Sequence, residues 1–220
     1  MKLDLHVHTT FSSDGRMGVK MVVRQAKKLG LGGVAITDHN SVEAQTKYGL
    51  HRDSGLLLIP GCEVSSAGGH ILAYGVKVLI PRDLPVVDTV EEITAEGGIA
   101  VAAHPYRSVT GLGEDNILQG RFRFVEGFNG RTRPNGNEKA MNLARRIGAT
   151  VTGGSDAHFQ EELGSAFTIV PDNVTTVDDI LEAIRAGRTR AAGQEADFTK
   201  YAGTAGANVV RFLRRGMRRM

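Results

Sequence analysis

Short apolar runs rich in β-branched residues alternate along this chain with stretches whose apolar side chains recur at helical spacing. The runs predict strands and the stretches predict helices, because side chains alternate between the two faces of a strand but follow a period of about 3.6 residues in a helix. The expected strands are 3–6, 33–37, 56–60, 70–76, 99–103, 124–128, 150–152 and 167–170, and the expected helices are 19–29, 41–51, 87–96, 137–147 and 177–186.

Four glycines follow the ends of expected helices, where a left-handed residue often stops the helix, namely Gly30, Gly97, Gly148 and Gly187. Strands alternating with helices indicate an α/β protein with a parallel sheet. Seven or eight strands in a chain of this length favour a (β/α) barrel, and a doubly wound open sheet remains the alternative. Polar residues that look functional follow most of the strands instead of meeting at one crevice, which favours the barrel.

Composition bounds the class of protein further. The 220 residues are 41% hydrophobic, enough for one well-buried core, and no apolar run reaches the roughly 18 residues that span a bilayer. An acid and an imidazole, Asp4 and His6, stand where a signal peptide would need apolar residues, so we expect a cytoplasmic protein. The single cysteine, Cys62, excludes an internal disulfide and thiolate-rich zinc ligation.

Positive charge is concentrated at the C-terminus. Residues 206–220 carry five arginines and no acid, so the formal net charge of +3 becomes −2 for residues 1–205. This amphipathic tail could make a weak contact with nucleic acid or another anionic surface, or simply pack against the barrel or fray. We therefore expect a barrel domain at residues 1–190 and a C-terminal extension at 191–220.

Six of the seven histidines lie at the borders between expected strands and loops, together with several acids. His6 and His8 close the first strand and share one face, because side chains two residues apart point the same way. The other members are Asp14, Asp38, His39, Glu63, His70, His104, Asp156 and His158, and only His51 falls outside the set.

Each of these residues also has an ordinary structural interpretation. The two histidines of the first strand could form a polar rim, Asp38 could cap the helix that begins near Ser41, and His104 could be a loop histidine ahead of a proline. Together, however, acids and imidazoles at one rim of a barrel repel or desolvate one another unless cations hold them. The pattern therefore predicts a polynuclear metal site.

Imidazole and carboxylate ligands suit Zn²⁺, Mn²⁺ or Fe²⁺. Several carboxylates also allow two ions to be bridged, which is an arrangement that clamps a phosphoryl group and generates a hydroxide at neutral pH. Hydrolysis of a phosphoester by a metal-bound hydroxide is the natural chemistry. The sequence contains no nucleophile elbow, Walker loop or dinucleotide fingerprint.

These motifs resemble, in order and spacing, the PHP (polymerase and histidinol phosphatase) superfamily of metal-dependent phosphoesterases. The resemblance covers about residues 1–188 and implies a distorted (β/α)₇ TIM-like barrel with two or three divalent ions at the C-terminal rim of its strands. The motifs are His6-x-His8, Asp14, Thr37-Asp38-His39, Gly61-x-Glu63, His70, His104-Pro105 and Gly154-Ser155-Asp156-Ala157-His158.

The resemblance also implies how the ligands divide. His6, His8, Glu63 and Asp156 resemble a first metal site, a bridging Glu63 with His70 and His104 a second, and Asp14, His39 and His158 a third. Asp14 stands where some members have a histidine, which leaves the identity and occupancy of the third ion open. Asp38 is expected to orient an imidazole, and either Asp14 or Asp38, or a bound water, could supply the proton for the leaving group.

Segment 126–131 resembles the small, stand-alone members of the family. Arg107, Arg131 and Asn129 are expected to bind the substrate phosphate. The leading hypothesis is hydrolysis of a small phosphorylated metabolite or nucleotide. A nuclease or 5′-end exonuclease acting on short oligonucleotides is the alternative enzyme, although the chain is only 5% aromatic. A regulatory or structural module stabilised by metal is the alternative that performs no catalysis.

Overall fold

One continuous sheet of nine strands organises the computed structural model, which describes residues 1–48 and 55–194. The order of strands across the sheet is β7-β6-β5-β4-β3-β2-β1-β8-β9. Their bounds are β1 Lys2–Val7, β2 Gly33–Ile36, β3 Leu57–Ser66, β4 Gly69–Tyr74, β5 Ile99–Ala102, β6 Phe124–Asn129, β7 Thr150–Gly154, β8 Ala166–Ile169 and β9 Arg190–Gly193.

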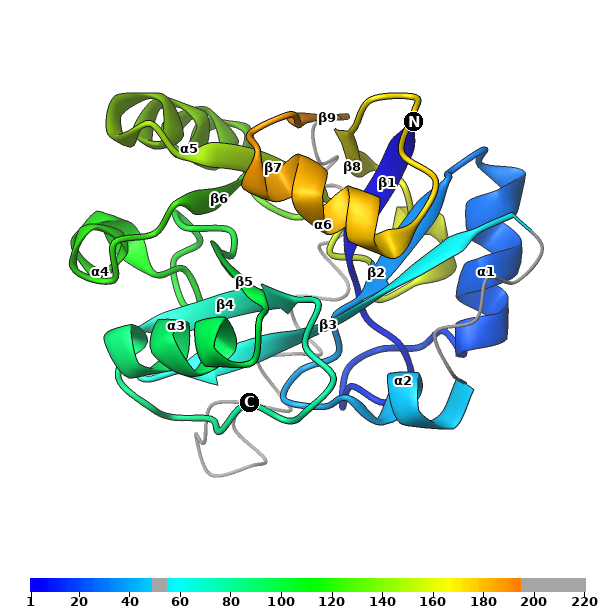
Figure 1. Ribbon diagram of the computed structural model, residues 1–220, viewed down its shortest axis with the longest axis horizontal. Coiled ribbons are helices and arrows are strands. Elements are labelled where there is room, and N and C mark those ends of the chain that lie inside the picture. The colour runs from blue at the N-terminus through cyan, green and yellow to red at the C-terminus, as the bar shows by residue number, and fades with distance from the viewer. Residues whose placement is uncertain (49–54, 195–220) are drawn as a thin grey trace.

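Helices surround this sheet, as Figure 1 shows. Their bounds are α1 Val19–Lys28, α2 Glu43–Tyr48, α3 Val86–Ala95, α4 Gly113–Gln119, α5 Pro134–Ile147 and α6 Val177–Arg185, and a short 3₁₀ turn spans Gln160–Glu162. Helix α6 lies across the front of the sheet in Figure 1. Its Ile180 and Ile184 pack in one buried cluster with Leu3 and Leu5 of β1 and Ile59 of β3.

The sheet curls into a nearly closed barrel, which confirms the expected fold class. Backbone hydrogen bonds join the end of β1 to the segment after β7: Asp156 donates to the His6 carbonyl at 2.7 Å, and His8 donates to the Ala157 carbonyl at 2.9 Å. We call these two segments, residues 6–8 and 154–158, the seam. Because the seam links an early segment to a late one, the barrel closes only when both are in place.

The expectation of a parallel sheet is correct for only part of the barrel. Strands β1, β2 and β3 are parallel, and so are β5, β6 and β7. Strand β4 is antiparallel to both of its neighbours, and β8 and β9 are also antiparallel to their partners. Only Ala67 and Gly68 separate β3 from β4, and a parallel crossover needs a dozen or more residues. The hairpin accounts for the distortion of the barrel.

The helix stops were predicted correctly. Gly30, Gly97, Gly148 and Gly187 all have φ between 67° and 73°, in the left-handed region. Helix α4, strand β9 and the short 3₁₀ turn were missed, however. Helix α4 carries only one buried residue, Ile117, so it lacks an apolar stripe, and β9 is a four-residue strand that begins at the predicted domain boundary.

Two sequence predictions fall outside the residues that the structure describes. They are the expected position of His51 on a helix and the amphipathic character of the arginine-rich tail at 206–220. Within residues 1–48 and 55–194, the structure contains no helix that is both long and apolar enough to cross a bilayer.

Replacing Gly154 by Ala should destabilise the protein, because the added methyl group would lie 2.4 Å from the His6 Cβ and 2.6 Å from its backbone nitrogen. Overpacking of this kind lowers the free energy of unfolding by about 1–3 kcal/mol, and the backbone at this position can move only slightly to relieve it. The matched control is Gly18→Ala, where an added methyl group meets nothing within 4 Å. Urea denaturation of both variants would measure the difference, and equal midpoints would contradict the tight seam.

Candidate metal centre

His6 of β1 and His8, which directly follows the strand, lie side by side at the rim of the barrel. His6 and His8 are both completely buried, and their ring centroids are 5.1 Å apart. Val7 points the other way and packs with Val22 and Val23 of α1. Strand periodicity therefore delivers two imidazoles to the interior and one apolar side chain to the helical layer.

Glu63 lies at the centre of the histidine cluster. It belongs to β3 itself and does not follow the strand as expected, because β3 continues past β2 to pair with β4. Its carboxylate faces five imidazoles. The contacts are Oε1 to His104 Nε2 at 2.8 Å and to His70 Nδ1 at 2.9 Å, and Oε2 to His39 Nδ1 at 3.1 Å, to His8 Nε2 at 3.2 Å and to His6 Nε2 at 3.3 Å.

Asp14 faces the cluster from the loop after β1. Its Oδ2 lies 3.0 Å from His158 Nε2 and 3.6 Å from His39 Nε2. On the other side of the centre, Asp156 Oδ1 lies 3.3 Å from His8 Nε2. The three carboxylates of Asp14, Glu63 and Asp156 thus face one continuous group of imidazoles.

All nine expected ligands meet at this one rim, and their potential ligand atoms form four overlapping groups. The groups are His8, Asp14, His39 and His158; His6, His104 and Asp156; His6, His8 and Glu63; and His39, Glu63 and His70. Within each group the atoms lie within 4.8 Å of one another. His8 and His39 each belong to two groups, so the boundaries between the proposed sites are less sharp than the family pattern implies.

The imidazoles differ in the direction in which the protein shifts their pKa. Burial, together with the nearby positive charge of Arg107, lowers the pKa of His104 to about 3. Burial, together with the nearby His8, lowers the pKa of His158 to about 4. Burial would also lower the pKa of His8, but the neighbouring carboxylates of Asp156 and Glu63 raise it to about 9. Neutral imidazoles can ligate directly, whereas His8 must release a proton to do so.

The carboxylates are held in the ionised form that a cation needs. Burial favours the neutral carboxyl of Glu63, but His39, His70 and His6 outweigh burial and hold its pKa well below the usual value. Burial likewise opposes ionisation of Asp156, and Arg107 foremost keeps its pKa well below normal. Asp14 behaves in the same way, with hydrogen bonds to His158 and His39 outweighing burial.

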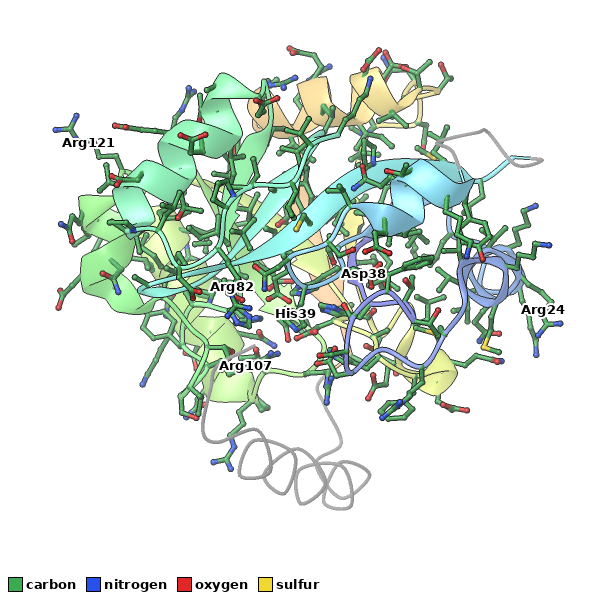
Figure 2. All side chains as sticks on the ribbon, turned by 90° about the horizontal axis from the view of Figure 1, so that it is seen from below. Arg24, Asp38, His39, Arg82, Arg107 and Arg121 are labelled. Atoms are coloured by element: carbon green, nitrogen blue, oxygen red, sulfur yellow. The ribbon has the colours of Figure 1, made fainter. Side chains whose placement is uncertain are left out.

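Arg107 lies in the centre and is paired with one of the expected ligands. Its Nη2 donates to Asp156 Oδ2 at 2.5 Å and to Asn129 Oδ1 at 2.9 Å, and its side chain is still 27% exposed. Figure 2, which views the molecule from below Figure 1, shows Arg107 near His39. Because Asp156 Oδ1 faces His6 and His8, one carboxylate connects the arginine to the imidazoles.

Arg131 lies over another part of the same rim. Its Nη1 is 2.6 Å from His158 Nδ1, and its side chain is 16% exposed. Asn129 lies beneath both arginines, and its Oδ1 accepts from Arg107 and from the backbone N–H of Arg131. Asn129 is completely buried, so the structure places it as a support for the arginines and not at the surface that a substrate would touch.

Asp38 occupies a different place from the expected one. Its carboxylate accepts from the Thr9 backbone N–H at 2.6 Å and from the Thr9 hydroxyl at 2.7 Å, and no described imidazole hydrogen-bonds to it. It therefore anchors the loop after β1 that carries Asp14. The hydroxyl that contacts an imidazole here belongs to Ser12, whose Oγ lies 3.1 Å from His8 Nδ1 and accepts from the His39 N–H at 2.8 Å. Sequence pattern carried no signal for Ser12.

Comparison with known sequences places this architecture in a family. Residues 134–189 match the family model described as PHP-associated. The uncharacterized protein MJ1587 of Methanocaldococcus jannaschii is 33% identical over 141 residues, which make up 59% of this chain and 82% of that protein. The chain belongs to the PHP superfamily, as its motifs predicted.

Solved structures share the fold at low sequence identity. A two-domain protein from Bacteroides vulgatus containing a predicted PHP-like metal-dependent phosphoesterase matches with a TM-score of 0.67 and 22% identity, over 88% of this chain. The lesion-specific endonuclease PfuEndoQ of Pyrococcus furiosus matches with a TM-score of 0.66 and 20% identity, over 86% of this chain. The present chain spans 65% of the first protein and 57% of the second.

A buried acid beneath the centre, Asp4, should make stability depend on pH. Burial outweighs the hydrogen bonds to Asp4 and raises its pKa from 3.8 to about 6. The folded state therefore holds this proton more tightly than the unfolded chain, and the contribution of Asp4 to stability decreases as pH rises from about 4 to about 6. Relative to Asp4→Asn, wild-type protein should lose on the order of 2–3 kcal/mol across that window. The free energies of unfolding of wild type and Asp4→Asn would be measured by urea denaturation at several pH values. If Asp4 is not responsible, the two values should change with pH in parallel.

Proposed function

We propose that this protein hydrolyses a phosphoester of a small phosphorylated metabolite or nucleotide, with two or three divalent metal ions held at the rim. The observation that carries the proposal is the Glu63 carboxylate, which faces five imidazoles at 2.8–3.3 Å beside two partly exposed arginines. Such a group of ligands next to guanidinium groups suits a substrate that carries a phosphate.

The residues present fit divalent ions of the transition series. Nε2 of His6, Nε2 of His8 and Oδ1 of Asp14 are buried and make no hydrogen bond to any described residue. Buried polar atoms normally have partners, so these atoms are suited to ligation. Nitrogen and oxygen donors together favour Zn²⁺, Mn²⁺ or Fe²⁺ over Mg²⁺ or Ca²⁺, which prefer oxygen alone.

In this proposal the nine clustered side chains hold the ions, and Glu63 is shared between neighbouring ions. The ligands are His6, His8, Asp14, His39, Glu63, His70, His104, Asp156 and His158. Bound ions would supply Lewis-acid polarisation of the phosphoryl group and would lower the pKa of coordinated water. The protein contributes a buried, ordered set of donors, so little reorganisation is needed when the substrate arrives.

The two arginines bind and orient the phosphate. Both guanidinium groups are held from the protein side, Arg107 by Asp156 and Arg131 by the Glu162 carboxylate 3.9 Å from its Nε, while part of each side chain remains exposed. A guanidinium can donate to two phosphate oxygens, and anchoring reduces the entropy lost when it does so. Asn129 fixes the spacing between the two arginines through its Oδ1.

Cleavage of nucleic acid is the second candidate function. It is favoured by the structural similarity to PfuEndoQ, which is a lesion-specific endonuclease. In this chain the same ligands would act on a phosphodiester bond, and the arginine-rich residues 206–220 would add electrostatic affinity for the nucleic acid backbone.

A hydrolysis screen separates these candidates. Metal-free protein would be supplied with Zn²⁺, Mn²⁺ or Fe²⁺ and tested on phosphomonoesters, phosphodiesters, nucleoside bisphosphates and short single- and double-stranded oligonucleotides. We expect metal-dependent release of phosphate from a small substrate. Cleavage confined to oligonucleotides would favour the nuclease, and failure to hydrolyse any phosphoester with any of the ions would contradict both proposals.

A further inference from the structure

A bulge in β6 turns two polar side chains into the barrel. Glu126 pairs with Thr152 of β7 and Phe128 pairs with Gly153, so Gly127 is an extra residue in the ladder. In a regular strand, residues three apart face opposite sides, but a one-residue bulge brings them to the same side. Glu126 and Asn129 are accordingly both buried and joined by a hydrogen bond of 3.1 Å from Nδ2 to Oε2.

Gly127 is the extra residue of this bulge. An added Cβ at this position would lie 2.5 Å from the Met141 sulfur and 3.2 Å from a methyl carbon of Val151. A side chain at this position would therefore have to displace the Met141 side chain of α5. Bulges next to a functional site commonly serve to redirect a side chain.

The Glu126 carboxylate connects two histidines of the metal centre. Its Oε1 lies 2.8 Å from His6 Nδ1, and its Oε2 accepts from the backbone N–H of His104 at 2.8 Å. The side chains of Glu126 and His6 are completely buried. Because an ionised carboxylate only accepts hydrogen bonds, Nδ1 of His6 must carry the proton in this contact.

This contact decides which nitrogen of His6 faces the centre. With the proton on Nδ1, the lone pair of Nε2 is directed toward Glu63 Oε2 at 3.3 Å and Asp156 Oδ1 at 3.6 Å once any second proton is released. The other contact restrains the loop after β5, where His104 has the unusual φ of 27°. The N–H bond from His104 to Glu126 holds this backbone, and the His104 ring reaches Glu63 from it.

We propose that Glu126 is a positioning residue that selects the Nδ1–H tautomer of His6 and fixes the backbone of His104, and so presents both rings to a divalent metal ion. The inference rests on the metal-ligating role proposed for these histidines. Carboxylates that receive the second N–H of a ligating imidazole orient the ring and increase its basicity, and their removal typically reduces metal affinity about 10–100-fold.

The first experiment needs no variant. In Zn²⁺-loaded protein with ¹⁵N-labelled histidine, two-bond ¹H–¹⁵N correlation spectra report which ring nitrogen carries a proton. We expect His6 to show a protonated Nδ1, with a strongly downfield proton resonance, and a Nε2 without a proton. A His6 ring protonated at Nε2 in the loaded protein would overturn the proposal.

The Glu126→Gln variant tests the cause. If the amide oxygen continues to accept from His104 and Asn129, the amide N–H₂ faces His6 Nδ1, which must then become an acceptor and place its proton on Nε2. We expect the downfield Nδ1–H signal to disappear and the Zn²⁺ affinity, measured by competition with a chromogenic chelator, to decrease about 10–100-fold. Retention of the signal with affinity within twofold of wild type would overturn the proposal.

Asp4→Asn is the matched control for removing a buried carboxylate. Asp4 is also completely buried, and it accepts backbone N–H bonds from Ser155 and Gly164 at 2.8 Å and from His6 at 3.3 Å without touching an imidazole ring. This control should keep the Nδ1–H signal. A His6→Ala variant separates the two proposals: unchanged Zn²⁺ binding would contradict metal ligation by His6, whereas a loss in His6→Ala but not in Glu126→Gln would contradict only the role of Glu126.

Discussion

Glu63→Gln should abolish the proposed phosphoester hydrolysis, with a decrease in kcat/KM of roughly 10³-fold or more. The substitution keeps the shape of the side chain but removes the one negative charge that faces five imidazoles. The amide nitrogen would also point a donor at ring nitrogens that must accept or ligate. Steady-state hydrolysis of a small phosphoester with each divalent ion, together with the metal content of the purified variant, would measure the effect.

The control for this substitution is Glu92→Gln, which makes the same chemical change on the exposed face of α3. It should leave both activity and metal content unchanged. Full metal content with full activity in Glu63→Gln would remove Glu63 from the shared position between ions. Full metal content with lost activity would instead mean that its charge serves the reaction more than the binding of the ions.

Arg107→Ala should weaken the substrate interaction, with kcat/KM reduced about 10²-fold and KM raised. The guanidinium is the partly exposed cation nearest to Asp156, so its loss removes a phosphate donor and also frees one oxygen of an expected ligand. Arg107→Lys should recover only part of the loss, because an ammonium cannot reproduce the two-pronged geometry of the guanidinium. Michaelis–Menten analysis of both variants on a phosphomonoester would measure the effect.

Arg121→Ala provides the comparison for a loss of positive charge alone. Arg121 is exposed and lies at the edge of the molecule in Figure 2, away from Arg107. Its substitution should leave KM unchanged at moderate salt, where charges separated by more than a Debye length of about 10 Å are screened. Equal increases in KM for Arg107→Ala and Arg121→Ala would mean that net charge, and not a phosphate contact, explains the effect.

Much of the site could be predicted because strand ends of a barrel converge. The alternation of β1 placed His6 and His8 on one face, and the parallel strands brought His39 and His104 to the same rim. How the ligands group could not be predicted, since it depends on local backbone departures. His104 and Asp156 both have positive φ, and β3 runs on past the point where an ordinary barrel strand would end.

The supporting residues were harder to recognise than the expected ligands. Glu126 stands three residues before Asn129, a spacing that normally places two strand residues on opposite faces. The bulge that reconciles them has only Gly127 as its sequence signal. Asp38 was recognised as part of the pattern, but its partner Thr9 lies on a loop whose path depends on tertiary contacts.

A metal ion bound across the seam would also affect how easily the barrel opens. Expected ligands lie on both of its sides, with His6 and His8 near the start of the chain and Asp156 and His158 far along it. An ion held between them would act as a reversible cross-link that closes a loop of about 150 residues, and a ligand that binds only the folded state suppresses opening. Backbone amides at residues 6–8 and 154–158 would then exchange fastest with solvent when a cell is short of the metal, and proteolytic lifetime would follow metal availability.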